Sequence, residues 1–223
     1  MNTRLHLVEK YWSYLLLMCA ILYIIICKSY ILDTFVLLTG VLCVALVAQG
    51  NIWNYPIGAI NTIAYAYVAY QNKLFGEALL FMFFYFPTNI VGYFLWKKKI
   101  TQNIVISKSL STKNKLIIAI SLAITTVLVG FVLKSIPEQN NPYIDAFITT
   151  LSVAATLLMI KRYSEQWILY IILNCFCVLL WTIRHINGSE SALSMIGMWS
   201  IFLVNACYGY YSWTKKLSKE NCK

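Results

Sequence analysis

Apolar residues fill most of this chain, and short polar or charged segments divide them into eight long runs. A helix needs about 20 residues to cross the hydrocarbon core of a bilayer, and every run reaches or approaches that length. The pattern predicts an all-α integral membrane protein with eight transmembrane helices, at about residues 12–30, 32–50, 52–72, 75–96, 116–135, 143–160, 166–186 and 190–213.

Two of these boundaries need an argument. The second and third runs share one charge-free stretch from Thr34 to Asn72. We divide it at Gln49-Gly50-Asn51, where polar and flexible residues favour a turn, and a single very long helix is the alternative. The first run, Tyr11 to Cys27, follows basic residues as a signal peptide would. It is long for a signal core and no small-x-small cleavage site follows it, so we expect a retained helix.

Composition supports the membrane class. Apolar residues make up 60% of the chain and charged residues 12%, and the mean hydropathy is +0.69. Soluble domains are usually about 25% charged, so too few charges remain here to coat a soluble globule. Seven cysteines show neither zinc-ligand spacing nor a disulfide framework, and we interpret those in apolar runs as small packing residues.

The net charge of +10 comes from basic residues that cluster between apolar runs. This placement argues against a nucleic-acid-binding face and is typical of cytoplasmic loops. Residues 97–115 alone carry six lysines. If this segment is cytoplasmic, both termini are cytoplasmic too. The 18 basic residues then all lie inside except Lys28, Lys73, Lys134 and Arg184.

An internal repeat is visible in the order of several weak motifs. Gly92 to Lys98 reads GYFLWKK, Gly209 to Lys216 reads GYYSWTKK, and each ends a run. Three further pairs keep the same order, namely Asp33 with Asp145, Trp53 with Trp167, and Asn61 with Asn174 within one residue. Runs two to four therefore resemble runs six to eight, and the fifth run between them gives both triplets the same orientation, as in transporters with parallel repeats.

The repeat divides the chain into five parts. We expect an extra N-terminal peripheral helix, a first three-helix repeat, a cytoplasmic loop with a linker helix, a second three-helix repeat and a cytoplasmic tail, at residues 1–30, 31–99, 100–140, 141–216 and 217–223. Two related three-helix bundles in this 3+1+3 plan would enclose a central pathway.

Three features together resemble the PnuC family of bacterial vitamin transporters: Trp-Asn-x-Pro-x-Gly from Trp53 to Gly58, the Gly-aromatic-x-x-Trp run ends, and the 3+1+3 plan. The resemblance covers nearly all of the chain from the second run onward. It implies a fold similar to the SWEET sugar transporters, nicotinamide riboside uptake across the bacterial inner membrane, and trapping by a separate cytoplasmic kinase. Sister branches carry thiamine or riboflavin. Pro87 to Tyr93 departs from the pattern of the riboside members, so another vitamin is the alternative.

Amide and aromatic residues recur every three, four or seven positions in the third, fourth, seventh and eighth runs, so each set lies on one helix face. Polar groups are costly in lipid, and these faces should therefore line the bundle interior. Aromatic rings stack on a flat vitamin ring and attract a cationic one, while asparagine both donates and accepts hydrogen bonds. The predicted substrate-binding residues are Trp53, Asn54, Asn61, Tyr65, Tyr85, Asn89, Tyr93, Tyr170, Asn174, Trp181 and Asn205.

Structural roles compete with ligand binding at several of these positions. Asparagine in a membrane helix often bonds only to a neighbouring helix. Trp96 and Trp213 lie near run ends, where we expect them to anchor the helices at the membrane interface. Pro87 should kink the fourth run because it lacks a backbone N–H. We expect three charged or titratable side chains at the outer rim or mouth: Glu77, Arg184 and His185.

The sequence predicts a transporter and no cofactor or metal. It has no phosphate-binding glycine loop and no acidic residue deep in a run, so we expect facilitated diffusion, with the two repeats rocking about a mid-membrane site. An intramembrane enzyme is disfavoured because the runs hold no Ser/His pair, carboxylate pair or metal set. A membrane assembly factor without a ligand is the other alternative. The expected partners are a small-molecule vitamin and the lipid bilayer. The cytoplasmic kinase is a functional partner, because it acts on the imported vitamin. The sequence leaves open whether the protein forms a homo-oligomer.

Overall fold

We analysed a computed structural model, which describes residues 3–27, 31–71, 75–101, 104–105, 107–135, 142–186 and 192–220. These residues form eight continuous helical segments and one short antiparallel hairpin, which confirms the all-α class. In chain order the elements are α1 (Thr3–Cys27), α2 (Ile31–Gln49), α3 (Asn54–Gln71), α4 (Phe75–Leu80), η1 (Phe81–Tyr85), α5 (Phe86–Lys97), β1 (Ile100–Thr101), β2 (Ile104–Val105), α6 (Thr112–Lys134), α7 (Pro142–Ile160), α8 (Gln166–Ile186) and α9 (Ala192–Glu220).

The break between the second and third runs falls where the sequence predicts it. Helix α2 ends at Gln49, and Gly50 takes a positive φ of 72° that favours glycine. The fourth run is one helical segment with a π-helical turn, η1, directly before Phe86-Pro87. Pro87 has no N–H for the preceding turn, so the regular hydrogen-bond ladder is disturbed at this point, in agreement with the predicted kink.

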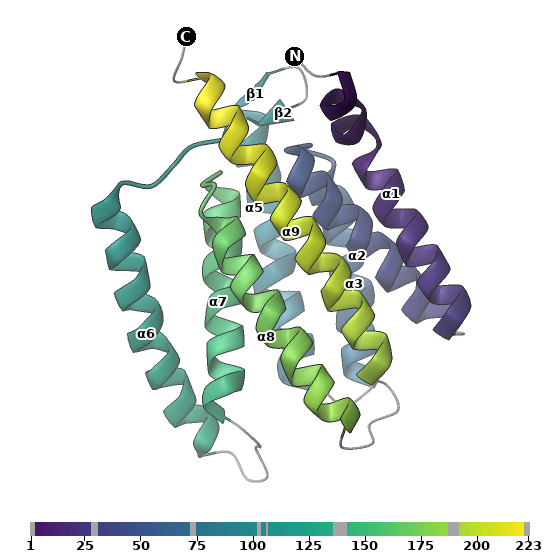
Figure 1. Cartoon of the computed structure of the whole chain (residues 1–223). Coiled ribbons are helices and arrows are strands. Elements are labelled where there is room, and N and C mark those ends of the chain that lie inside the picture. The colour runs from purple at the N-terminus through teal and green to yellow at the C-terminus, as the bar shows by residue number, and fades with distance from the viewer. Residues whose placement is uncertain are drawn as a thin grey trace.

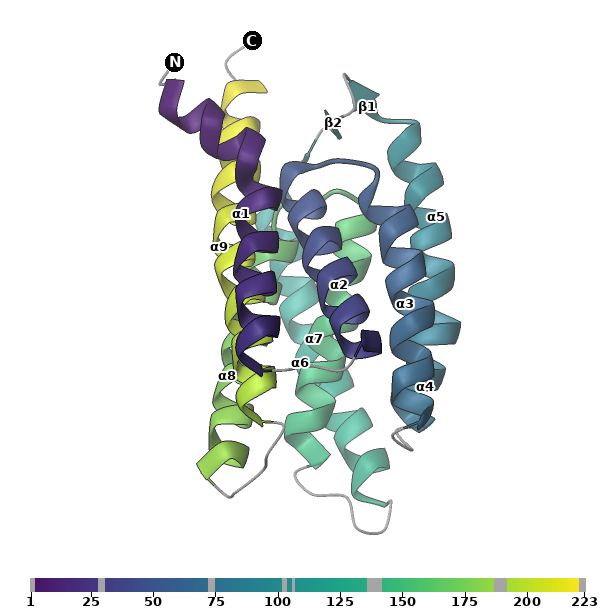
Figure 2. The same cartoon turned by 90° about the vertical axis from the view of Figure 1, so that its right-hand side faces the viewer.

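Six of the helical segments form a closed ring. Helix α2 contacts α3, α3 contacts α5, α5 contacts α7, α7 contacts α8, α8 contacts α9, and α9 returns to α2. Helix α1 packs outside this ring against α2 and α9, and α6 packs outside it against α7, as Figures 1 and 2 show. The interior of the ring is therefore the place where side chains of both halves of the chain meet.

The start of α1, the end of α9 and the β1–β2 hairpin lie at the same end of the bundle (Figure 1). The α7–α8 turn lies at this end as well. We name it the basic end, because its described residues include Lys97, Lys98, Lys99, Lys108, Lys113, Lys115, Lys161, Arg162 and Lys215.

Four helical stretches are long and apolar enough to cross a membrane by themselves: Ala78–Lys97, Thr112–Lys134, Pro142–Ile160 and Gln166–Ile183. Shorter apolar stretches occur in α1 and α2. Helices α3 and α9 are not among them because they carry asparagines, glutamine or lysines along with their apolar residues. Helix α6 exposes a row of leucine, isoleucine, valine and phenylalanine side chains, as expected of a helix that faces lipid.

The turns after α2 and α7 have the same hydrogen-bond pattern. Gly50 N–H donates to Val47 O and Asn51 N–H to Leu46 O, both at 2.9 Å. In the second turn the equivalent donors are Arg162, with a φ of 65°, and Tyr163, again at 2.9 Å. Each pattern is a Schellman motif, which closes a helix with a left-handed residue. The recurrence is what an internal repeat predicts, and the division of the whole chain into two repeats stays a prediction.

This pattern corrects one pair of the proposed alignment. When the two turns are aligned with Gly50 on Arg162, Tyr55 and not Trp53 falls opposite Trp167. Packing agrees, since a Cβ added to Gly92 would meet the Tyr55 ring and one added to Gly209 would meet the Trp167 ring. The sequence comparison paired two identical letters, whereas the structure pairs two aromatic rings that each fit against a glycine.

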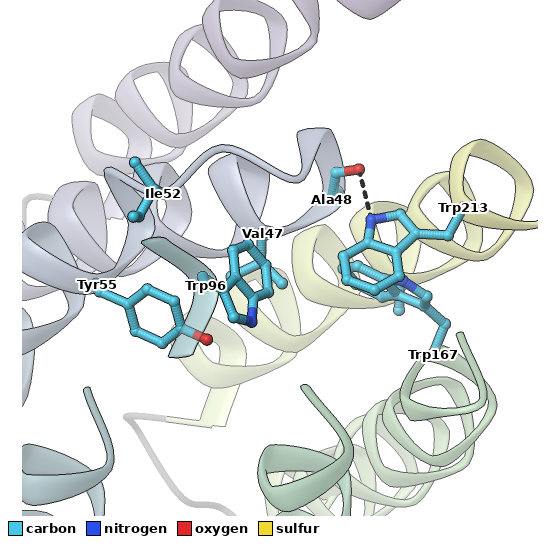
Figure 3. Packing of buried hydrophobic residues seen from close by; sticks show 8 residues of the cluster. Val47, Ala48, Ile52, Tyr55, Trp96, Trp167 and Trp213 are labelled. Atoms are coloured by element: carbon cyan, nitrogen blue, oxygen red, sulfur yellow. Dashed lines mark hydrogen bonds between the residues drawn. The ribbon is translucent and has the colours of Figure 1, made fainter. Parts of the chain in front are cut away.

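Trp96 and Trp213 do not anchor the protein at the membrane interface, contrary to our expectation. The two residues are 0% and 1% exposed and belong to one buried cluster, and Figure 3 shows both beside Tyr55 and Trp167. Together with Tyr55 and Trp167 they form a buried group that we name the aromatic layer. Interfacial position was inferred from distance to the run ends, but α5 and α9 place these two residues on their inward faces.

Candidate binding cavity

The ring of helices encloses a cavity of about 240 Å³. Residues from α2, α3, η1, α5, α7, α8 and α9 line it, while the described side chains of α1 and α6 contribute none. Small-molecule sites commonly begin at about 300 Å³, so this space suits one small ligand. Trp167 belongs both to the cavity wall and to the aromatic layer, so the layer borders the cavity on the side of the basic end.

Six of the eleven predicted binding residues come together around this cavity. They are Asn61 from α3, Tyr85 from η1, Asn89 from α5, Tyr170 and Asn174 from α8, and Asn205 from α9. Their convergence from four separate helical segments agrees with the interior faces that the spacing predicts. Ligand contact at each of them stays a prediction.

The other five predicted residues lie outside the cavity wall. Trp53 is 62% exposed in the turn before α3. Asn54 is fully buried at the start of α3, where its Nδ2 donates to Asn51 O at 2.6 Å. Tyr65 stacks behind Phe81, a ring that does line the cavity. The remaining two are Tyr93, in an apolar crevice between α3 and α5, and the half-buried Trp181.

The four asparagine carboxamides of the cavity differ in how many hydrogen bonds they make to other groups of the protein. Asn61 Nδ2 donates to Val36 O at 2.7 Å and to Thr39 Oγ1 at 2.9 Å. Asn89 Nδ2 donates to Tyr85 O at 3.0 Å and to Thr62 Oγ1 at 3.2 Å.

Asn205 uses both of its polar atoms, whereas Asn174 uses neither. Asn205 Nδ2 donates to Val44 O and its Oδ1 accepts from Trp12 Nε1, both at 2.9 Å. The Asn174 carboxamide has no hydrogen-bond partner among the described residues, although the residue is only 3% exposed. Asn174 is therefore the side chain best placed to bond a ligand, because a buried amide without a partner is unfavourable.

The cavity wall, within the described part of the chain, carries no charged side chain. No group of three His, Cys, Asp or Glu residues among the described residues is arranged to hold a metal ion. Binding must therefore rely on aromatic faces, carboxamides and hydroxyl groups. This composition suits a neutral or cationic ring compound and gives no counter-charge to an anion.

A family model described as a nicotinamide mononucleotide transporter matches residues 30–215. The chain belongs to the PnuC family of membrane transporters. The relatives named nicotinamide riboside transporter PnuC include those of Neisseria mucosa, 34% identical over 82% of this chain and 72% of the relative, and of Haemophilus influenzae, 35% identical over 82% and 79%. That of Escherichia coli is 26% identical over 67% of this chain and 73% of its own.

A crystal structure of the vitamin B3 transporter PnuC has the same fold, with a TM-score of 0.80 and 30% identity. The match covers 95% of this chain and 92% of the crystallised one. As a member of this family, the protein is a multi-pass membrane transporter and not an enzyme, as the sequence predicts.

Sequence reasoning missed several residues of the PnuC cavity. Ser152 and Thr156 of α7 lie four residues apart and face the space, where Ser152 Oγ shares a hydrogen bond with Tyr85 OH and Thr156 Oγ1 with Tyr170 OH. Their spacing was visible, but hydroxyl groups in a membrane helix often bond their own backbone and carry a weak signal. Other overlooked side chains of the wall include Thr62, Thr88, Phe81, Trp167, Trp199 and Phe202.

The charged residues expected at the far end of the PnuC bundle are only partly described. His185 is exposed, in agreement with a position at the rim. The side chains of Glu77 and Arg184 lie outside the described residues. Of the described cysteines, Cys177 is buried and Cys175 exposed, so the two occupy different faces of α8, and only Cys177 belongs to a buried cluster.

One buried carboxylate near the basic end was also overlooked. Glu165, in the α7–α8 turn, is 8% exposed and its Oε1 accepts from Ser109 Oγ at 2.7 Å and pairs with Lys115 Nζ at 2.9 Å. Burial alone raises the pKa of this carboxyl, but the hydrogen bonds from Ser109 and Lys115 outweigh it, so the pKa lies below the ordinary value. The contact fastens the segment before α6 to the turn after α7.

Proposed function

We propose that this protein imports nicotinamide riboside across the bacterial cytoplasmic membrane by facilitated diffusion. The observation that carries the proposal is the uncharged cavity, in which four carboxamides and several aromatic rings from both halves of the chain converge. Relatives that are 34% and 35% identical to this chain are named as transporters of this compound. The ligand has a cationic pyridinium ring with a carboxamide and a ribose, and each part has a matching group in the wall.

Aromatic faces hold the pyridinium ring. The cavity wall includes four large aromatic side chains, Tyr85, Tyr170, Trp167 and Trp199. The quadrupoles of these rings attract a cationic ligand even though the wall supplies no carboxylate as a counter-charge. Asn174 donates to and accepts from the ligand carboxamide or the ribose hydroxyls, because an asparagine side chain supplies both functions. The hydroxyl groups of Ser152 and Thr156 offer further ribose contacts.

The same wall disfavours nicotinamide mononucleotide. The phosphate of the mononucleotide carries up to two negative charges, and no Lys, Arg or His is among the described residues of the wall. A phosphate buried without a counter-charge is strongly unfavourable, so the riboside is the better ligand.

Transport follows from alternating opening of the two ends of the ring. The aromatic layer closes the basic end, and opening it requires the two sides of the ring to separate there. We place the basic end and both termini in the cytoplasm because basic residues concentrate at this end. Phosphorylation of the imported riboside by a cytoplasmic kinase then traps it, since the phosphorylated product no longer suits the cavity.

Uptake into proteoliposomes tests the proposal. Purified protein in vesicles without any ion gradient should equilibrate labelled nicotinamide riboside, and unlabelled riboside should compete more strongly than thiamine, riboflavin or the mononucleotide. Enclosing a riboside kinase with ATP should raise accumulation above equilibrium. Dependence on an imposed gradient contradicts facilitated diffusion, and stronger competition by thiamine or riboflavin assigns a different vitamin.

A further inference from the structure

Helix α1 lies outside the ring, and none of its described side chains belongs to the cavity wall, yet one of them reaches a residue that does. Trp12 is 8% exposed, and its indole Nε1 donates to Asn205 Oδ1 at 2.9 Å. The same indole stacks on Tyr208 of α9, with ring centroids 3.9 Å apart and an angle of 20° between the planes. Residues from α1 lie outside the family model, which begins at residue 30.

The partners of Asn205 fix the orientation of its carboxamide. An indole N–H can only donate, so the atom that faces Trp12 must be the oxygen. A backbone carbonyl can only accept, so the atom that faces Val44 must be the nitrogen. One carboxamide of α9 is therefore held from two sides, by α1 and by α2.

This orientation determines which hydrogen-bonding groups of Asn205 remain available to a ligand in the cavity. A carboxamide has two N–H donors and two acceptor lone pairs, and Val44 and Trp12 occupy one of each. One N–H and one lone pair remain at Asn205, which lines the cavity. Such a donor–acceptor pair matches a hydroxyl group or the carboxamide of a ligand.

We propose that Trp12 is a positioning residue for substrate binding, which acts through Asn205 and makes α1 a part of the binding machinery. The proposal rests on the proposed function, because it needs the cavity to bind nicotinamide riboside. Without the indole N–H, Asn205 Oδ1 loses its anchor and the carboxamide turns about its side-chain bonds. Ligand binding must then order the Asn205 carboxamide, which Trp12 otherwise holds in place, and this entropic cost lowers the affinity.

The variant W12F tests this, because phenylalanine keeps a ring on Tyr208 and removes the N–H. Y23F is the matched control. Tyr23 OH of α1 donates to Leu193 O of α9 at 2.9 Å, so Y23F also removes one α1–α9 hydrogen bond while keeping the ring. Leu193 is 54% exposed and lies outside the cavity wall. We expect W12F to weaken nicotinamide riboside binding about fivefold, from one lost hydrogen bond, and Y23F to leave it unchanged.

Both variants are measured as purified full-length protein, by calorimetric titration with nicotinamide riboside and by thermal unfolding. Equal loss of affinity in W12F and Y23F overturns the proposal, because α1 then acts only by docking on α9. Unchanged affinity in W12F overturns it as well. If the wild-type protein does not bind the riboside, the proposed function fails, and this result is distinct from either outcome.

A double-mutant cycle shows whether Trp12 acts through Asn205. We expect W12F to weaken binding in the wild-type background and to have no further effect in N205A. The same fold-loss in both backgrounds overturns the proposal, because Trp12 then acts by another route. If N205A cannot be purified, the comparison of W12F with Y23F decides by itself.

Discussion

The indole ring centroids of Trp96 and Trp213 lie 5.9 Å apart, and each indole donates a hydrogen bond to the neighbouring helix of the ring that belongs to the other half of the chain. Trp96 Nε1 of α5 donates to Met159 O of α7, and Trp213 Nε1 of α9 donates to Ala48 O of α2, both at 3.1 Å. Figure 3 shows Trp213 and Ala48 joined in this way beside Trp96 and Tyr55. The two bonds tie one half of the chain to the other at the basic end, where the aromatic layer borders the cavity.

These crossing bonds should stabilise the closed basic end. W96F and W213F each remove one indole N–H and with it one hydrogen bond between the two halves of the chain, at a cost of about 1 kcal/mol. For a protein of this size we expect each variant to lower the melting temperature by about 2–4 °C. Initial riboside uptake into proteoliposomes should rise, because the closed end opens more easily.

Trp199 provides the matched control for this pair. Its ring packs edge-on against Phe202 with centroids 5.7 Å apart, and its buried N–H has no partner among the described residues. W199F therefore removes an indole without breaking a hydrogen bond. A loss of melting temperature in W199F as large as in W96F would show that ring size, and not the crossing bonds, holds the end closed.

Gln166 and Asn54 occupy equivalent turns but differ in hydrogen bonding. Both are fully buried, and Asn54 Nδ2 has a partner in Asn51 O, whereas neither amide atom of Gln166 has one among the described residues. A buried unpaired amide costs about 1–3 kcal/mol. We expect Q166M to raise the melting temperature and to slow riboside uptake, because the closed state gains stability.

The control for Gln166 is N54L, which removes a hydrogen bond and should lower the melting temperature. Thermal unfolding and uptake are measured on both variants under the same conditions. A lower melting temperature in Q166M, comparable to that of N54L, means that the Gln166 amide is bonded in the folded protein.

How far the sequence could be interpreted depended on the strength of each local signal. Asn61 and Asn174 stand out because a carboxamide in an apolar run must face inward, and the cavity wall includes both. Trp96 was misplaced because distance to a run end does not say which face of the helix a residue occupies. The match of Trp53 with Trp167 failed because letter identity cannot detect that a tyrosine and a tryptophan fill equivalent spaces. Glu165 looked like an ordinary loop residue, since its partner Lys115 lies far from it in the sequence, in the first turn of α6.

Asn174 and Asn205 should separate binding from folding. The Asn174 carboxamide has no partner among the described residues, so N174A removes no protein hydrogen bond, whereas N205A breaks two. We expect N174A to weaken riboside binding about tenfold with little change in melting temperature, since a hydrogen bond to a buried group contributes about 1.4 kcal/mol. N205A should lower the melting temperature by several degrees.

The measurements for this pair are a titration with nicotinamide riboside and thermal unfolding of the ligand-free protein. Unchanged affinity in N174A would contradict its assignment as a ligand-binding residue. If N174A unfolds as easily as N205A, its carboxamide acts in helix packing.

Gly92 and Gly209 should be intolerant of a side chain. A Cβ at Gly92 would overlap the Tyr55 ring, and one at Gly209 would lie 2.6 Å from the Trp167 ring. Both rings belong to the aromatic layer and cannot move freely, so G92A and G209A should each cost about 1–3 kcal/mol of folding free energy. G40A is the control, because its Cβ would come no closer than 3.4 Å to a neighbour. Equal melting temperatures for all three variants would contradict the close packing of the layer.

Glu165 should make stability depend on pH. The hydrogen bonds from Ser109 and Lys115 lower its pKa in the folded protein below the ordinary value of 4.5, so the folded state holds its proton less tightly than the unfolded state. The stabilisation is therefore fully present above pH 4.5 and is lost as the pH falls through the lowered pKa. In E165Q this contribution is absent, because glutamine carries no charge for Lys115. We expect wild type to melt at a higher temperature than E165Q between about pH 5 and 7, with a difference that shrinks as the pH falls below 4.5. If the difference in melting temperature between wild type and E165Q does not change with pH, the contact of Glu165 with Ser109 and Lys115 depends on hydrogen bonding and not on the charge of Glu165.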